Sequence, residues 1–186
     1  MATLNIKEHA STANNRTLIQ SSDITISIAI SFNTASELFI KNAAKGKYLP
    51  LSLEKTAVEA ARELYVACKN GYAPAIYLSG NTIHTLMSND INQDNINQWV
   101  YDMLSLVKYH LPPEKSIRRI FSGGQSGVEI AGASAAQALD IETVIIMPKG
   151  YIQRNPRNRD ERHSLEYITT QVNSFKSKIL ANSNQK

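Results

Sequence analysis

The chain of 186 residues is long enough to bury a sizeable core in one domain, and its 42% hydrophobic and 19% charged residues exclude a disordered polyampholyte. No apolar run approaches the roughly 18–20 residues that span a bilayer, and the only cysteine, Cys68, excludes an intrachain disulfide or a cysteine-based zinc site. The net charge of +4 is compatible with an anionic ligand and does not argue for nucleic acid. The histidines do not have the spacing of metal ligands, so we expect no metal site. The first twenty residues do not resemble a signal peptide, so we expect a cytoplasmic protein.

The first regular elements are predicted after a polar, aperiodic segment at 1–15, which we expect to be frayed. Within 23–31, isoleucines alternate with small or polar residues, and this period of two predicts a strand. The sequence from Thr34 to Glu37 then matches a capping box, in which a hydroxyl and a carboxylate satisfy free backbone N–H groups. A helix is therefore predicted from Thr34 to about residue 44.

The remaining pattern alternates strands with helices. Strands are predicted at 48–51, 75–78, 118–121 and 143–147, and helices at 52–69, 96–111, from the following glycine-rich loop to about 139, and from about 164. The polar stretch 88–97 predicts a loop, and 181–186 a frayed end. This alternation predicts an α/β protein, a Rossmann-like three-layer sandwich with a mostly parallel sheet of about five strands flanked by helices. We expect a single domain over 16–180, against the alternative of two small domains divided near Pro112-Pro113.

A glycine-rich loop between a predicted strand and a predicted helix carries the strongest functional signal. Glycines let the backbone turn sharply and let a ligand approach the N–H groups, and the N-terminus of the following helix favours phosphate or another anion. The serine and glutamine side chains can add hydrogen bonds. The alternative is a set of small turn residues before a tightly packed helix. The candidate ligand-binding residues of this loop are Ser122, Gly123, Gly124, Gln125, Ser126 and Gly127.

Further candidates lie where neighbouring strands end. Glu129 falls in the first turn of the predicted helix. Its role is either structural, a carboxylate stabilised by the helix dipole, or functional, a group that hydrogen-bonds a ribose or purine edge or acts as a catalytic acid. Lys149 closes a strand and either meets an anion or remains a solvated surface lysine. Residues 149–162 include five basic and two acidic residues. This basic stretch either forms a clamp for phosphate or is simply exposed surface. Because ligands bind at the carboxyl ends of parallel strands, the remaining candidate site residues are Thr34, Ser79, Gly80 and Gly150.

At these residues the chain resembles the molybdenum cofactor carrier family, which is related to lysine-decarboxylase-like phosphoribohydrolases and to the DNA-processing protein fold. Ser122-Gly-Gly-Gln-Ser-Gly-Val-Glu129 is similar to the family's S-G-G-Q-T-G-V-D, and Met147-Pro-Lys-Gly150 to its C-P-K-G. The family's later elements resemble segments between 16 and 81, upstream of the loop, so the resemblance implies a circularly permuted member. An arginine of the family motif is replaced by Ile130, and its acidic stretch after P-K-G by 151–157, so the ligand is expected to differ.

The resemblance and the loop together imply a small-molecule binding protein for a nucleotide or a phosphorylated pterin-like ligand, with the molybdenum cofactor or a nucleotide as the bound group. One alternative is a nucleoside-phosphate or N-glycosidic-bond hydrolase that uses Glu129. Another is an interaction protein with a vestigial pocket. We expect a phosphorylated small molecule as partner, with no membrane and no nucleic acid, and the resemblance implies a homo-oligomer.

Overall fold

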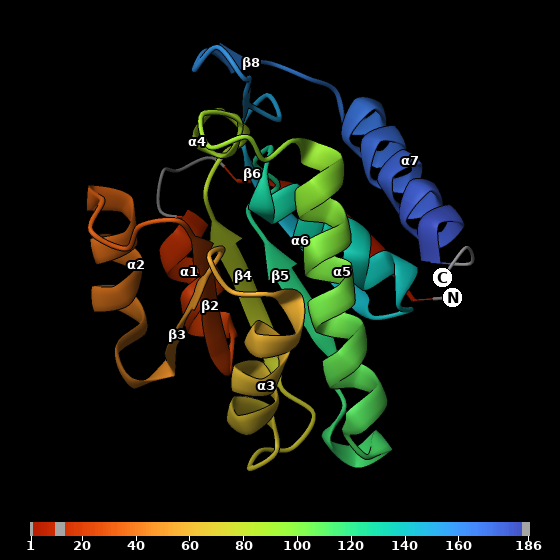
Figure 1. The fold of residues 1–186 in the computed structure, drawn as a ribbon. Coiled ribbons are helices and arrows are strands. Elements are labelled where there is room, and N and C mark those ends of the chain that lie inside the picture. Colours follow the sequence, from red (N-terminus) through yellow and green to blue (C-terminus); the bar gives the residue numbers. More distant parts are fainter. Residues whose placement is uncertain (1, 10–13, 184–186) are drawn as a thin grey trace.

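The computed structural model describes residues 2–9 and 14–183, which form the α/β fold predicted from the sequence. Six strands make one sheet in the order β1-β6-β5-β4-β2-β3, and every neighbouring pair is parallel. Helices cover both faces, which gives the Rossmann-like three-layer sandwich (Figure 1). The strands of this sheet are β1 (Leu4–His9), β2 (Ile24–Ala29), β3 (Tyr48–Ser52), β4 (Ala75–Gly80), β5 (Arg119–Ser122) and β6 (Glu142–Pro148). The α-helices are α1 (Asn14–Ser21), α2 (Ala35–Ala44), α3 (Ala57–Cys68), α4 (Ile83–Met87), α5 (Gln93–His110), α6 (Val128–Ala138) and α7 (Leu165–Ser183).

Apolar side chains of the strands form separate core clusters on the two faces of the sheet. Ile26 and Ile28 lie in a cluster with buried residues of α3, α5 and α6 on one face. Tyr77 lies in a cluster on the other face, together with buried residues of α1 and α2. In a third cluster, buried residues of α7 pack against α6 and β6. Since β4 pairs with both β2 and β5, the segments before and after Pro112-Pro113 contribute strands to one sheet.

The expectation that residues 1–15 are frayed is wrong for the part that the structure describes. Leu4–His9 form edge strand β1, paired with β6 from Leu4↔Thr143 to His9↔Pro148, and α1 begins at Asn14; residues 10–13 lie outside the described residues. The sheet therefore has six strands rather than five. An edge strand pairs on one side only, and the apolar residues of β1 that pack against the core are Leu4 and Ile6, so its apolar pattern is too short to stand out.

Several predicted boundaries shift. The predicted helix 52–69 begins at Ala57, where Thr56 and Glu59 form a capping box, and the first residues of the polar stretch 88–97 lead into α5, which begins at Gln93. The predicted frayed end at 181–186 is helical through Ser183, and residues 184–186 are not described. The basic stretch is partly ordered as a hairpin of β7 (Gln153–Arg154) and β8 (Asp160–Glu161). No helix in the described ranges is long and apolar enough to cross a membrane.

Candidate functional site

A cavity of about 380 Å³ opens at the edge of the sheet where the parallel strands end. Because strands of one direction place all their carboxyl ends at one edge, β1, β4, β5 and β6 contribute together, and the helices that follow strands begin there. The volume lies within the about 300–1,000 Å³ of typical small-molecule pockets. The residues that line the cavity are His9, Asn15, Ser36, Ile40, Ser79, Gly80, Thr82, Gly123, Gln125, Glu129, Ile146, Pro148 and Lys149.

About half of the candidate site residues predicted from the sequence line the cavity. Those that line it are Ser79, Gly80, Gly123, Gln125, Glu129 and Lys149. Those that do not are Thr34, Ser122, Gly124, Ser126, Gly127 and Gly150. Sequence reasoning missed His9, Asn15 and Ser36, because the first two fall in the segment expected to be frayed and the third inside a predicted helix. Thr34 is instead an exposed N-cap, whose hydroxyl accepts a hydrogen bond from the N–H of Glu37 at 3.3 Å.

The glycine-rich loop after β5 uses most of its backbone donors inside the protein. Gly124 N donates to Ser122 Oγ at 3.0 Å, and Gln125 N donates to the Glu129 carboxylate at 3.0 Å. Gly127 N donates to Gln93 Oε1 at 2.8 Å. The Glu129 carboxylate and the Gln93 side-chain oxygen thus accept hydrogen bonds from the loop N–H groups that were expected to bind a phosphate. The loop shapes the cavity wall rather than forming a ready anion cradle.

Gly124 faces the core rather than the cavity. Its φ of +73° lies in the left-handed region, and a Cβ at this position would lie 2.7 Å from Ile145 Cγ2 and 2.8 Å from Met147 Cγ. The glycine is therefore needed for close packing of the loop on β6.

Two polar side chains of the loop, Gln125 and Ser126, hold the segment that leads into the hairpin. Gln125 Nε2 donates to the carbonyl of Ile152 at 3.0 Å, and Gln125 Oε1 accepts from Arg154 N at 2.9 Å. The hydroxyl of Ser126 donates to the carbonyl of Arg154. Gln153 adds a bond from its side-chain amide to the carbonyl of Gly124 at 2.8 Å. These side chains join loop and hairpin, so their hydrogen-bonding capacity is largely used.

The N-termini of three helices meet at the cavity. Asn15 lies in the first turn of α1, Ser36 in the first turn of α2, and Glu129 in the first turn of α6. Each helix N-terminus carries partial positive charge, which favours an anion. Lys149 adds a full positive charge to the lining, and it makes no ion pair with other described residues. The cavity is thus suited to a negatively charged ligand near α1, α2 and Lys149.

Glu129 is the buried acid of the cavity, with 8% of its surface exposed. Burial raises the pKa of its carboxyl from 4.5 to about 7, against the lowering effects of hydrogen bonds from Gln125 N and from the Tyr77 hydroxyl, and the nearby charge of Glu37 raises it further. The Tyr77 hydroxyl donates to Glu129 Oε1 at 3.2 Å. Near neutral pH both protonation states of Glu129 are therefore populated, so it can donate or accept a proton.

A second buried acid, Glu37, lies on the same face of the sheet. The Ser27 hydroxyl donates to its carboxylate, and the Tyr48 hydroxyl lies 3.4 Å from the same oxygen. Burial raises the pKa of Glu37, although both hydrogen bonds lower it. The sequence predicted a helix-capping role for this carboxylate, but Thr34 caps α2 without it. The carboxylate turns inward because α2 packs over the hydroxyl of Ser27.

The described residues contain no group of three or more His, Cys, Asp or Glu side chains that could hold a metal ion. Comparison of the chain with protein-family models, curated proteins and solved structures gives no match. The geometry and chemistry of the cavity are therefore the basis for inferring a function.

Proposed function

We propose that the chain binds a small phosphorylated molecule, a nucleotide or a phosphorylated pterin-like compound, in the cavity at the carboxyl edge of the sheet. The observation that carries the proposal is the convergence of the α1 and α2 N-termini and Lys149 on a cavity that also holds the buried acid Glu129. The phosphate would lie against Ser36, Asn15 and Lys149 rather than in the glycine-rich loop. The resemblance to the molybdenum cofactor carrier family supports the pterin-like member of this class.

Glu129 would recognise the organic part of the ligand by hydrogen bonding. Gln125 is bonded to the hairpin segment, and the Ser79 hydroxyl donates to the carbonyl of Ile26 at 3.3 Å, whereas each Glu129 oxygen accepts one hydrogen bond and retains a lone pair. A heterocyclic edge with N–H or ring nitrogen atoms would meet this carboxyl. The Thr82 hydroxyl is a further polar group of the same wall.

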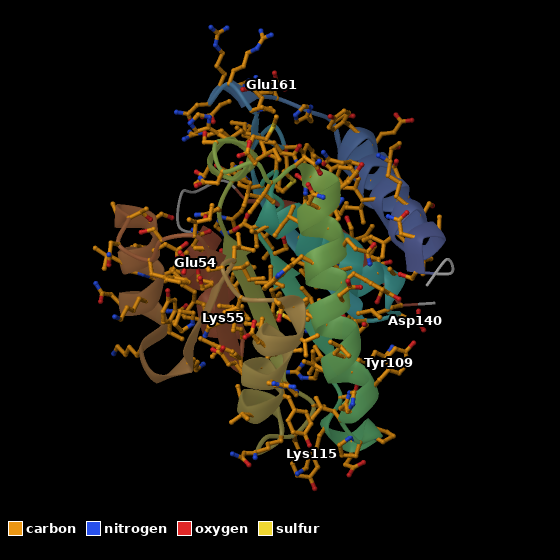
Figure 2. All side chains as sticks on the ribbon, viewed as in Figure 1. Glu54, Lys55, Tyr109, Lys115, Asp140 and Glu161 are labelled. Atoms are coloured by element: carbon orange, nitrogen blue, oxygen red, sulfur yellow. The ribbon has the colours of Figure 1, made fainter. Side chains whose placement is uncertain are left out.

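Calorimetric titration with nucleoside monophosphates and a phosphorylated pterin tests the proposal. We expect Lys149→Ala to weaken binding about tenfold, because a hydrogen bond to a charged group contributes about 1.5–3 kcal/mol and partial exposure reduces it. Lys115→Ala is the matched control, since Lys115 lies at the opposite end of the molecule from the hairpin (Figure 2). If none of these compounds binds, the reading as an interaction protein with a vestigial pocket is favoured instead.

A second candidate function is hydrolysis of an N-glycosidic bond, and the pKa of Glu129 at about 7 favours it. In this reaction protonated Glu129 gives its proton to the departing base, and the bond between base and ribose breaks. A water molecule supplies the hydroxyl left on the sugar, and its remaining proton returns to Glu129. Product analysis with nucleoside monophosphates separates the two functions. Turnover by the wild type that is lost in Glu129→Gln, with binding retained, supports hydrolysis; binding without turnover supports a carrier.

The proposal also includes the oligomeric state of the protein and its location in the cell. The family resemblance supports self-association, and light scattering that finds only monomer at working concentrations would contradict it. The single cysteine, Cys68, is buried and unpaired, which agrees with a cytoplasmic location. Fractionation that places the chain outside the cytoplasm would overturn that location.

A further inference from the structure

The β7–β8 hairpin is rooted at the rim of the cavity. Lys149 lines the cavity, and the next residue, Gly150, closes the base of the hairpin by accepting a hydrogen bond from His163 N at 3.1 Å. Near the top of Figure 1 the hairpin rises beside α4, and Glu161 marks it in Figure 2. Any charge at the base of the hairpin is therefore close to the cavity mouth.

The acidic residues of the hairpin are engaged within it. Asp160 pairs with Arg154 at 2.9 Å, and Glu161 Oε1 accepts from Asn155 Nδ2 at 2.7 Å. Within the described parts of the chain, Arg157, Arg159 and Arg162 make no ion pair, and all three are exposed. The hairpin therefore presents three arginines whose charge no carboxylate among the described residues neutralises.

These three arginines occupy two different places. Arg157 and Arg159 lie at the tip, where the backbone N–H groups of both residues donate to Asn155 Oδ1, at 2.9 and 3.0 Å. The tip contacts α4, because His84 Nδ1 lies 3.0 Å from the carbonyl oxygen of Pro156. These two arginines therefore lie on the tip, which contacts α4 through Pro156, and neither lines the cavity.

Arg162 lies at the base instead, against Gly150. A Cβ atom on Gly150 would lie 3.5 Å from Arg162 Cδ and 3.8 Å from its Nε, so the arginine stem runs along the glycine next to Lys149. A long, flexible arginine in this place can bring its guanidinium to the cavity mouth beside the ammonium of Lys149. Lys149 precedes Gly150, the Arg162 stem lies against Gly150, and Gly150 N donates to Glu8 Oε1 at 2.7 Å. Neither cation makes an ion pair with a described carboxylate, so the two suit two adjacent anionic groups, and guanidinium binds phosphate through two parallel hydrogen bonds.

We propose that Arg162 forms a second anion subsite beside Lys149 at the mouth of the cavity, and that the ligand carries a diphosphate. The inference rests on the proposed binding function and specifies the ligand class within it. The inner phosphate lies against Lys149 and the first turn of α2, and the outer phosphate lies against Arg162. A monophosphate leaves the outer subsite empty.

The test is a set of calorimetric titrations at one fixed ionic strength. The probes are AMP, ADP, GMP and GDP, with inorganic phosphate and pyrophosphate to remove any dependence on the base. We expect each diphosphate to bind about tenfold or more tightly than its monophosphate partner. Arg162→Ala is expected to abolish this preference and to leave monophosphate affinity unchanged, and Arg162→Lys to restore it in part.

Arg157→Ala is the matched control, because it removes the same charge from the same hairpin at the tip. A loss of diphosphate affinity equal to that of Arg162→Ala would show general attraction by the hairpin and overturn the subsite. Equal binding of mono- and diphosphates by the wild type would overturn the subsite and leave the proposed function standing. Failure of every probe, and of the phosphorylated pterin, to bind would overturn both. Because Arg162 is exposed, its replacement is expected to leave the unfolding midpoint unchanged.

Discussion

Replacing Glu129 with glutamine should change the way in which the stability of the protein depends on pH. Glu129 is buried between the Tyr77 hydroxyl and Gln125 N, and burial raises the pKa of its carboxyl from 4.5 to about 7. The folded protein therefore holds the proton more tightly than the unfolded chain does. The stabilisation that protonation provides is complete below pH 4.5 and is lost as the pH rises through 7.

The size of the effect follows from the shift. One pKa unit corresponds to about 1.4 kcal/mol, so a rise from 4.5 to about 7 corresponds to about 3 kcal/mol of lost stability between the two pH limits. Glutamine keeps the volume of the side chain but does not titrate. The wild type should thus lose about 3 kcal/mol relative to Glu129→Gln between pH 4.5 and pH 8. For a chain of this length, 1 kcal/mol shifts the melting temperature by roughly 2–4 °C.

Urea unfolding of both proteins at several pH values between 4.5 and 8.5 measures this difference. Glu37 also has a raised pKa, but it is present in both proteins, so the comparison cancels most of its contribution. Two stability curves that run parallel across this range would contradict a raised pKa of Glu129, because the carboxyl would then titrate alike in the folded and unfolded states. A wild type that gains stability over the variant as pH rises would show that the ionised form is the favoured one.

Three further substitutions test the parts of the structure that shape the site. Gly124→Ala should lower the free energy of unfolding by about 2–4 kcal/mol, measured in urea, because its φ is +73° and the new Cβ would lie 2.7 Å from Ile145 Cγ2; an unchanged midpoint would contradict the observed loop packing. Gln125→Ala should speed hydrogen exchange in the hairpin while leaving β4 protected, since two hydrogen bonds to the hairpin segment are lost, and equal rates in both proteins would count against this anchoring role. Thr56→Ala should cost about 1 kcal/mol in thermal unfolding through the lost cap of α3, whereas a cost below a few tenths would show that Glu59 alone holds the cap.

The parts of the fold that depend on neighbouring residues could be predicted from the sequence. The isoleucines of β2 alternate with a period of two, and Thr34 starts α2 where its hydroxyl caps Glu37 N. Such signals work because burial of one strand face and satisfaction of a helix end involve residues a few positions apart. The location of the cavity was likewise predictable, since Ser79, Glu129 and Lys149 follow from the rule that parallel strands end at one edge.

The alternation of strands and helices, and the edge of the sheet at which polar side chains gather, could both be predicted without coordinates, because they follow from local periodicity and chain direction. Which groups at that edge are free to bind a ligand depends on the tertiary structure. Gly127 N is bonded to Gln93, and Gln125 is bonded to residues of the hairpin, so these loop groups are engaged by residues roughly thirty positions away. The pKa of Glu129 likewise depends on its burial beside Tyr77, 52 positions earlier in the chain. Burial and the choice of hydrogen-bond partner depend on which distant segments come together, and no local pattern records that.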